Sequence, residues 1–149
     1  MDLVIRPICE NELGTLVQLC QEHAAYEGSP YSPIGKAEAL REHIFLMKQG
    51  LHCLVVDAKQ QLVGYTFFFK QFSTWEAKHY IYMDCLYLTA SHRNLGLGKR
   101  LLGEIKKYAL RENYSEIQWQ TPLTNAKAIK FYEREGAQAR SKARFFMKI

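Results

Sequence analysis

The sequence lacks the features that mark membrane proteins and disulfide-rich secreted proteins. No apolar run approaches the length of about 20 residues that a membrane-spanning helix requires. The first residues, MDLVIRP, have neither the basic stretch nor the long apolar segment of a secretory signal. The four cysteines include no C-x-x-C pair. We therefore expect reduced thiols, no contact with membranes and a cytoplasmic location.

Metal-ligand patterns, repeats and low-complexity tracts are also missing. The histidines are too dispersed for a local metal site, and we expect each to be a surface residue or one with satisfied ring nitrogens. They are His23, His43, His52, His79 and His92. The chain has 149 residues, of which 48% are hydrophobic. This is the size of one compact domain, so we expect a single domain over residues 1–149.

The charge balance is only mildly basic. There are 20 Lys and Arg against 15 Asp and Glu, a formal net charge of +5. Such an excess favours an anionic ligand weakly. The basic residues do not gather into a patch, so a nucleic-acid-binding module, which basicity alone suggests, is not expected.

Apolar periodicity predicts a mixed α/β arrangement. Runs with strand-like composition are expected to form strands at 3–6, 51–56, 62–72, 79–88, 116–121 and 143–149. Apolar residues at helical spacing predict helices at 11–24, 37–47, 98–112 and 125–135. The long strand at 79–88 is almost entirely apolar, as in a central strand covered on both faces. The order predicts an α/β or α+β three-layer fold, a mixed central sheet flanked by helices.

A glycine-rich turn, HRNLGLGK, joins this apolar strand to the next predicted helix. It is not a Walker A loop, because Arg100 follows Lys99, and Gly96 and Gly98 do not have the spacing of a dinucleotide fingerprint. Glycines nevertheless let backbone amides approach a ligand, and a helix begins with unpaired amides and a positive dipole end. With Arg93 nearby, the turn fits a pyrophosphate. An ordinary strand-to-helix turn is the alternative.

The R-x-x-G-x-G pattern of Arg93, Gly96 and Gly98 resembles the acetyl-CoA pyrophosphate motif of the GNAT N-acetyltransferases. A second signature of that family is similar to NAKAIKFYEREGA at 125–137. The predicted element order also fits the GNAT fold over essentially the whole chain. The resemblance implies an enzyme that transfers the acetyl group of acetyl-CoA to an amine in a ternary complex, without a metal. It also implies a homodimer.

The resemblance further implies which residues bind the cosubstrate. Backbone groups of the turn would hold its pyrophosphate, and amides of the preceding strand would lie along the pantetheine arm as oxyanion donors. These residues are Arg93, Asn94, Leu95, Gly96, Leu97, Gly98 and Lys99 in the turn, with Leu86, Tyr87 and Leu88 in the strand. Asn125 would bind the pantetheine arm, or it caps the last helix, since Asn is a preferred N-cap residue.

Two side chains are candidates for proton transfer. An alkyl ammonium group has a pKa near 10.4, so a base or a water must take its proton before attack. Asp84 is the only acidic residue between Glu76 and Glu104, and burial there would raise its pKa toward a useful value. By resemblance, Tyr132 lies beside the cofactor sulfur and protonates the leaving thiolate. The alternatives are an ordinary strand-end carboxylate and a packed helix tyrosine.

A narrower resemblance concerns the acceptor. AAYE at 24–27 and STWEAKHYIYMDCLYLTASHRNLGLG at 73–98 are similar to diamine (spermidine/spermine) and thialysine acetyltransferases. This implies a small cationic acceptor: a diamine, a polyamine or a basic amino acid. The candidate acceptor-binding residues are Tyr26, Glu27, Trp75, Glu76, Tyr82 and Asp84. The chain departs from these relatives at Asp84–Cys85, where they commonly have Glu-Asp, at Asn94, where they have Gly, and in ending before their final strand extension.

One observation and two alternative functions keep the assignment of the acceptor and of the activity open. The net charge of +5 opposes a polycation at long range. A protein N-acetyltransferase would need a cleft wide enough for a peptide. A non-catalytic CoA-binding regulator on the same fold would bind CoA without releasing thiol from acetyl-CoA.

Overall fold

The structure, a computed structural model, describes residues 2–48 and 50–149. The chain divides into two compact units, Met1–Trp119 and Gln120–Ile149. We describe each unit by itself, and the single domain expected over residues 1–149 stays a prediction.

The first unit is built on one mixed sheet, as its strand-like runs predict. Its five strands follow one another in chain order across the sheet. They are β1 (Leu3–Pro7), β2 (His52–Ala58), β3 (Gln61–Ser73), β4 (Lys78–Leu88) and β5 (Ile117–Gln118). The first four are antiparallel neighbours, whereas β5 runs parallel to β4. The predicted strand at 116–121 is therefore real but much shorter than expected.

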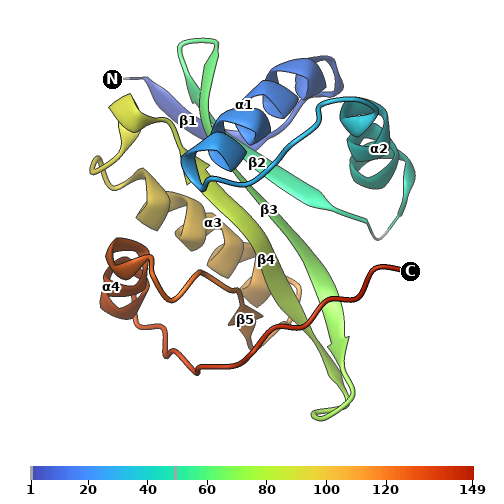
Figure 1. Ribbon diagram of the computed structural model, residues 1–149, viewed down its shortest axis with the longest axis vertical. Helices are drawn as coiled ribbons and strands as arrows, with labels where there is room; N and C mark the ends of the chain where they lie inside the picture. The colour runs from blue at the N-terminus through green and yellow to red at the C-terminus, as the bar shows by residue number, and fades with distance from the viewer. Residues whose placement is uncertain (1, 49) are drawn as a thin grey trace. The chain divides into compact units, whose positions relative to one another are not determined.

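The two long helices of this unit, α1 (Leu13–Tyr26) and α3 (Leu97–Arg111), pack on the sheet (Figure 1). Each buries an apolar stripe: Leu16 on α1 joins a core cluster with Tyr65 and Tyr87, and Leu101 on α3 joins another with Val56. Since neighbouring residues of a strand point to opposite faces, the two clusters cover the two sides of the sheet. We refer to these as the α1 side and the α3 side.

Short helical segments complete the first unit. They are η1 (Glu10–Glu12), α2 (Lys36–Arg41), η2 (Glu42–Leu46) and η3 (Ala90–His92). The helix predicted at 37–47 thus changes from α-helical to π-helical hydrogen bonding part of the way along. None of the helices in the described residues is long and apolar enough to cross a membrane.

A left-handed glycine ends α1 and fixes the residue before it. Gly28 has φ +69°, and its amide donates to the carbonyl of Ala25 at 3.1 Å. The amide of Ser29 donates to the carbonyl of Ala24 at 2.8 Å. This pair of bonds is a Schellman motif, in which glycine takes the left-handed position at no steric cost. Glu27, directly before Gly28, therefore has a well-defined backbone position.

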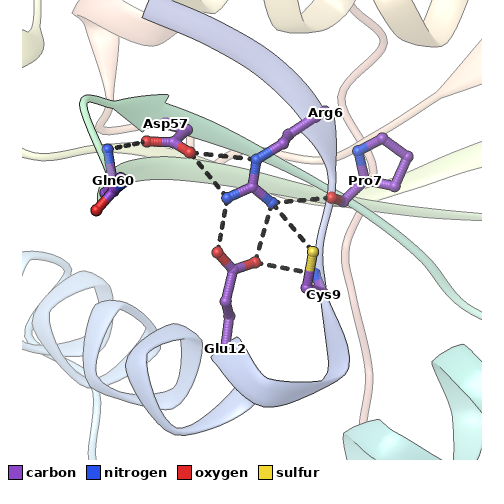
Figure 2. A network of polar contacts seen from close by, with 6 residues as sticks. All are labelled: Arg6, Pro7, Cys9, Glu12, Asp57 and Gln60. Atoms are coloured by element: carbon purple, nitrogen blue, oxygen red, sulfur yellow. Dashed lines mark hydrogen bonds and ion pairs between the residues drawn. The ribbon is translucent and has the colours of Figure 1, made fainter.

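An arginine clamp holds the start of α1 against the sheet (Figure 2). Both terminal nitrogens of Arg6 bind Glu12, at 2.6 and 3.0 Å, and two nitrogens bind Asp57, at 2.9 and 3.2 Å. The other Asp57 oxygen accepts from the amide of Gln60 at 2.6 Å, in the turn between β2 and β3. One guanidinium thus joins β1, the first helical turn and a hairpin turn that contains no glycine.

The second unit contains α4 (Ala126–Arg134), close to the helix predicted at 125–135. The strand predicted at 143–149 is wrong, since these residues form no regular structure. Its apolar side chains, among them Phe145 and Phe146, are exposed. A strand is stable only when a neighbouring strand pairs with its backbone. Residues 120–149, as described, contain no strand that could supply that pairing.

Candidate active site

The edge of β4 that faces β5 is open along half of its length. β4 and β5 pair only through Ile81 and Tyr82 with Ile117 and Gln118. In the described parts of the chain, no strand pairs with this edge of β4 beyond Tyr82. The backbone groups that follow therefore have no ladder partner on that side.

The amides of Leu86 and Leu88 point toward this open edge. The amide of Thr89 donates to Val63 on β3 at 2.9 Å. Because successive amides of a strand point in opposite directions, that of Tyr87 also faces β3 and those of Leu86 and Leu88 face away from it. Two of the three predicted oxyanion donors are thus available, whereas the amide of Tyr87 belongs to the sheet.

A β-bulge displaces Asp84 from the regular ladder. Phe67 pairs with Cys85 and Phe68 pairs with Met83, so Asp84 has no residue opposite it on β3. The expected burial of Asp84 is wrong, because the bulge leaves its side chain outside the ladder and exposed; the Cys85 thiol contacts its Oδ2 at 3.9 Å. Bulges re-aim side chains and often lie next to active sites. The candidate base therefore stands where β4 changes direction, beside the open edge.

The last turn of α1 lies over the same strand and carries a hydrogen-bonded chain. His23 Nδ1 is 2.6 Å from the Tyr65 hydroxyl, and its Nε2 is 3.0 Å from Glu27 Oε1. The imidazole stacks on the ring of Tyr87 with a centroid distance of 4.7 Å. Glu27 is thereby tied to the sheet through a histidine whose ring nitrogens are both satisfied, as expected for the histidines.

Arg93 joins the glycine turn to this end of α1. Its Nε donates to the carbonyl of Leu88 at 3.0 Å, and its guanidinium lies 4.0 Å from the centroid of the Tyr26 ring. Cation–π contacts of this kind contribute about 0.5–2 kcal/mol. The side chain of Arg93 thus fixes the turn relative to β4 and α1, and Tyr26 receives a protein cation.

Two carboxylates act on this part of β4 although the whole chain is basic. Burial raises the pKa of the Cys85 thiol to about 12, and the neighbouring Asp84 and Glu27 carboxylates act in the same direction. Asp84 precedes Cys85 on β4, and Glu27 is tied through His23 to Tyr87, two positions after Cys85 on the same strand. A cation placed there would meet two negative charges.

The glycine turn presents backbone amides at the start of α3. Gly96 is in the left-handed region with φ +75°, as is Asn94 with φ +62°. The amide of Arg100 donates to the carbonyl of Gly96 at 3.1 Å. The amides of Leu97, Gly98 and Lys99 come before it, where a helix has no internal acceptors. The side chains of Leu95 and Lys99 are exposed, whereas that of Leu97 is buried.

The glycine turn and the open edge of β4 both fit acetyl-CoA, the cosubstrate that the sequence implies. A helix N-terminus with glycine at its cap is a suitable site for a diphosphate. The open edge of β4, only a few residues earlier in the chain, offers amides and carbonyls of the kind that bind amide groups. The Arg100 guanidinium, by contrast, donates to the carbonyl of Leu3 at 3.3 Å. Arg93 and Lys99 are therefore the cations of this segment that remain for a diphosphate.

Trp75 and Glu76 lie at the tip of the β3–β4 hairpin, which extends beyond the rest of the sheet in Figure 1. Trp75 is 93% exposed. The strand from Lys78 to Asp84 spans about 20 Å at the usual rise per residue. The structure therefore does not bring these two candidates together with Glu27 and Asp84. Tyr82 is closer, on the α1 side with Phe69 at 5.6 Å.

The remaining candidates belong to the second unit. Asn125 caps α4, since its Oδ1 accepts from the amide of Ala128 at 3.2 Å. The capping alternative is thus confirmed, and the NH₂ group is the part of the side chain left for a ligand. Tyr132 lies on α4 with its ring 5.1 Å from that of Phe131.

Sequence reasoning missed His23 and Tyr65. The spacing of His23 and Glu27, four residues apart on a helix, was a usable signal, because such residues face each other. Tyr65 gave no signal, since its partner is 42 positions away in the sequence.

Comparisons with known proteins agree with this geometry. The family model described as the acetyltransferase (GNAT) family matches residues 16–137. The thialysine N-epsilon-acetyltransferase of Bos taurus is 27% identical over 144 residues, which cover 91% of this chain and 84% of that protein. An L-ornithine N5-acetyltransferase of Arabidopsis thaliana is 31% identical over 77 residues, 52% of this chain and 34% of that protein.

Solved structures show the same fold. An aminoglycoside acetyltransferase from an uncultured soil metagenomic sample has a TM-score of 0.81 at 19% identity, covering 99% of this chain and 95% of that one. Because the family model spans most of the sequence, the mixed sheet with its open β4 edge and glycine turn is the framework of an acetyl-transferring enzyme. The chain belongs to the GNAT family of acetyltransferases.

Proposed function

We propose that this enzyme transfers the acetyl group of acetyl-CoA to the primary amine of a small cationic acceptor by direct attack in a ternary complex. The observation that carries the proposal is a pair of carboxylates beside the open edge of β4: Asp84 on the bulge, and Glu27, which His23 ties to Tyr87. The names of the relatives support it, since thialysine and ornithine are both amino acids with a second amine.

Asp84 receives the proton of the attacking ammonium group, directly or through a water. An ammonium with a pKa near 10.4 is protonated at neutral pH and cannot attack until it loses that proton. The bulge holds the Asp84 carboxylate outside the ladder, beside the strand along which the acyl group would lie. A positioned general base contributes typically about 10²–10⁴-fold to the rate.

The amides of Leu86 and Leu88 stabilise the negative charge that develops on the acyl oxygen. Backbone donors held by a sheet need little reorganisation during the reaction, and removing one such donor typically costs roughly 10²–10³ in rate. Bound acetyl-CoA would supply the activated acyl group. The amides between Arg93 and Lys99 hold its diphosphate, and Asn125 contributes its amide group to the pantetheine arm.

Tyr132 donates a proton to the departing thiolate. A phenol has a pKa near 10 and a thiol near 8.5, so the transfer is favourable when it occurs together with cleavage of the carbon–sulfur bond. This role rests on the match of 125–137 to the family signature.

The test is release of free thiol from acetyl-CoA with putrescine, spermidine, lysine, thialysine, ornithine and a peptide as acceptors. We expect turnover with the small diamines and amino acids and little with the peptide. Tyr132→Phe should lower kcat and leave the KM for acetyl-CoA unchanged. Unchanged turnover in that variant would remove Tyr132 from the mechanism. CoA binding without thiol release across the panel would overturn the proposed function.

A further inference from the structure

We propose that His23 is a positioning residue that aims the Glu27 carboxylate at a second cationic group of the acceptor, so that the enzyme prefers diamines to monoamines. The inference rests on the proposed function and adds a specificity-determining residue to it. It starts from the Tyr65–His23–Glu27 chain, which the acetyl-transfer steps above do not use.

The protons of this chain have one consistent arrangement in the neutral imidazole. An ionised Glu27 can only accept, so His23 Nε2, at 3.0 Å, carries the ring proton. Nδ1 is then an acceptor, and the donor to it is the Tyr65 hydroxyl at 2.6 Å. Burial raises the pKa of Tyr65 well above its ordinary value, so this hydroxyl keeps its proton. Tyr65 thus selects the tautomer that presents N–H to Glu27.

The imidazole cannot turn away from this arrangement without losing contacts on two sides. The ring stacks on Tyr87 at 4.7 Å with an interplanar angle of 19°. It also meets the edge of Tyr65, which is only 1% exposed in the central sheet. The His23 side chain itself is 13% exposed. The orientation of a loop-facing carboxylate is therefore set by a rigid core strand.

Glu27 occupies a position that helix stability does not favour. It is the residue at the C-terminal end of α1, where the helix dipole is negative and a carboxylate is unfavourable. The Schellman bonds fix its backbone, and His23 holds its Oε1. Its side chain is 43% exposed, and among the residues that the structure describes no lysine or arginine pairs with it. Oε1 is held by His23, and no hydrogen bond to Oε2 is found among the described residues.

The charged side chains around Glu27 suit an acceptor that carries two positive charges. Arg93 lies on the ring of the neighbouring Tyr26 and donates to Leu88, and it forms no ion pair with Glu27. Asp84, on the bulge of β4, takes the proton of the reacting nitrogen. One carboxylate therefore serves the attacking amine, and Glu27 is left for the distant ammonium group.

The experiment measures kcat/KM for 1,4-diaminobutane and for butylamine, which lacks the second charge, and compares the two values as a ratio. Glu27→Gln should reduce this ratio about tenfold or more, because a hydrogen bond between charged groups is lost. His23→Leu should reduce it roughly fivefold by releasing the carboxylate. His23→Gln should restore most of the ratio, since a glutamine can accept from Tyr65 and donate to Glu27. Glu22→Gln, on the same helix and exposed, is the matched control for charge.

The outcomes distinguish a failure of the proposed acetyltransferase function from a failure of the role proposed for His23. Thermal unfolding of each variant is recorded, because His23→Leu removes the hydrogen bond between the Tyr65 hydroxyl and His23 and lowers stability. If the wild-type enzyme releases thiol with no acceptor of the panel above, the proposed function fails; if it acetylates other acceptors of that panel but not 1,4-diaminobutane, the preference for diamines is refuted. If it acetylates both 1,4-diaminobutane and butylamine and His23→Leu keeps the wild-type ratio, the role of His23 alone is refuted. A ratio as low in His23→Gln as in His23→Leu would also refute it, because packing rather than hydrogen bonding would then be responsible.

Discussion

Replacement of Gly64 by alanine tests whether β3 sets the position of the open β4 edge. Gly64 lies opposite Leu88 on β4 and is buried. A Cβ atom there would be 2.8 Å from the carbonyl oxygen of Tyr87 and 2.6 Å from Leu88 Cδ2. The leucine side chain can rotate, but the carbonyl is part of the strand. Gly64→Ala therefore has to displace β4 at the residues that carry the proposed oxyanion donors.

The size of the effect follows from that contact. Ordinary contacts of a Cβ atom begin near 3.4 Å, so β4 has to move by about 0.6 Å from its 2.8 Å separation. Overpacking of a core costs about 1–3 kcal/mol. Alanine also lowers the conformational entropy of the unfolded chain, which raises the free energy of unfolding by roughly 0.4–1 kcal/mol. We expect Gly64→Ala to lower the free energy of unfolding by about 1–2 kcal/mol and the melting temperature by about 3–6 °C.

Urea unfolding and steady-state kinetics measure both consequences. The displaced Leu88 amide should reduce kcat about tenfold, because catalysis is sensitive to shifts of less than 1 Å. Gly103→Ala is the matched control, since Gly103 lies inside α3 and a methyl group there would meet no atom within 4 Å. It should stabilise the protein by about 0.5–1 kcal/mol and leave kcat unchanged. A Gly64→Ala variant with wild-type stability and kcat would refute the reasoning.

The arginine clamp makes part of the stability acid-sensitive. The Arg6 hydrogen bonds hold the pKa of Glu12 below its ordinary value of 4.5, so this stabilisation is complete above that value and is lost as the pH falls through the folded-state pKa. Urea titrations should show a smaller loss of stability between pH 5 and 3 in Glu12→Gln than in the wild type. At pH 8 the exposed Cys9 should react with a thiol reagent, whereas Cys85, whose pKa burial raises to about 12, should react only after unfolding. Asp84→Asn should lower kcat about 100-fold with little change in the KM for acetyl-CoA, and an unchanged kcat would exclude Asp84 as the base.

Features set by neighbouring residues were predictable from the sequence. The apolar stripe of α3 predicted a helix from residue 98, and the helix begins at Leu97. The polar stretch at 57–61 predicted the hairpin between β2 and β3, which turns at Lys59 and Gln60. In each case the signal is local, either a repeat of apolar positions or a cluster of polar residues between two apolar runs.

Features set by distant partners were not predictable. The bulge at Asp84 changes which residues of β4 face the α1 side, but both faces of the strand are apolar, so the shift leaves no trace in the pattern. The bond between His23 and Tyr65 depends on how α1 packs on the sheet. The segment at 143–149 has the composition of a strand, yet composition supplies no pairing partner.

The bulge also has a consequence for how this strand can vary. Met83 pairs with Phe68 and Cys85 pairs with Phe67, so these two residues alternate between the faces as direct neighbours in a regular strand would. Asp84 is therefore an additional residue, and a shorter β4 without it would keep every other side chain on its present face. The His23 ring would still rest on Tyr87 in such a chain. The candidate base, Asp84, thus occupies the position of β4 that the pairing with β3 does not require.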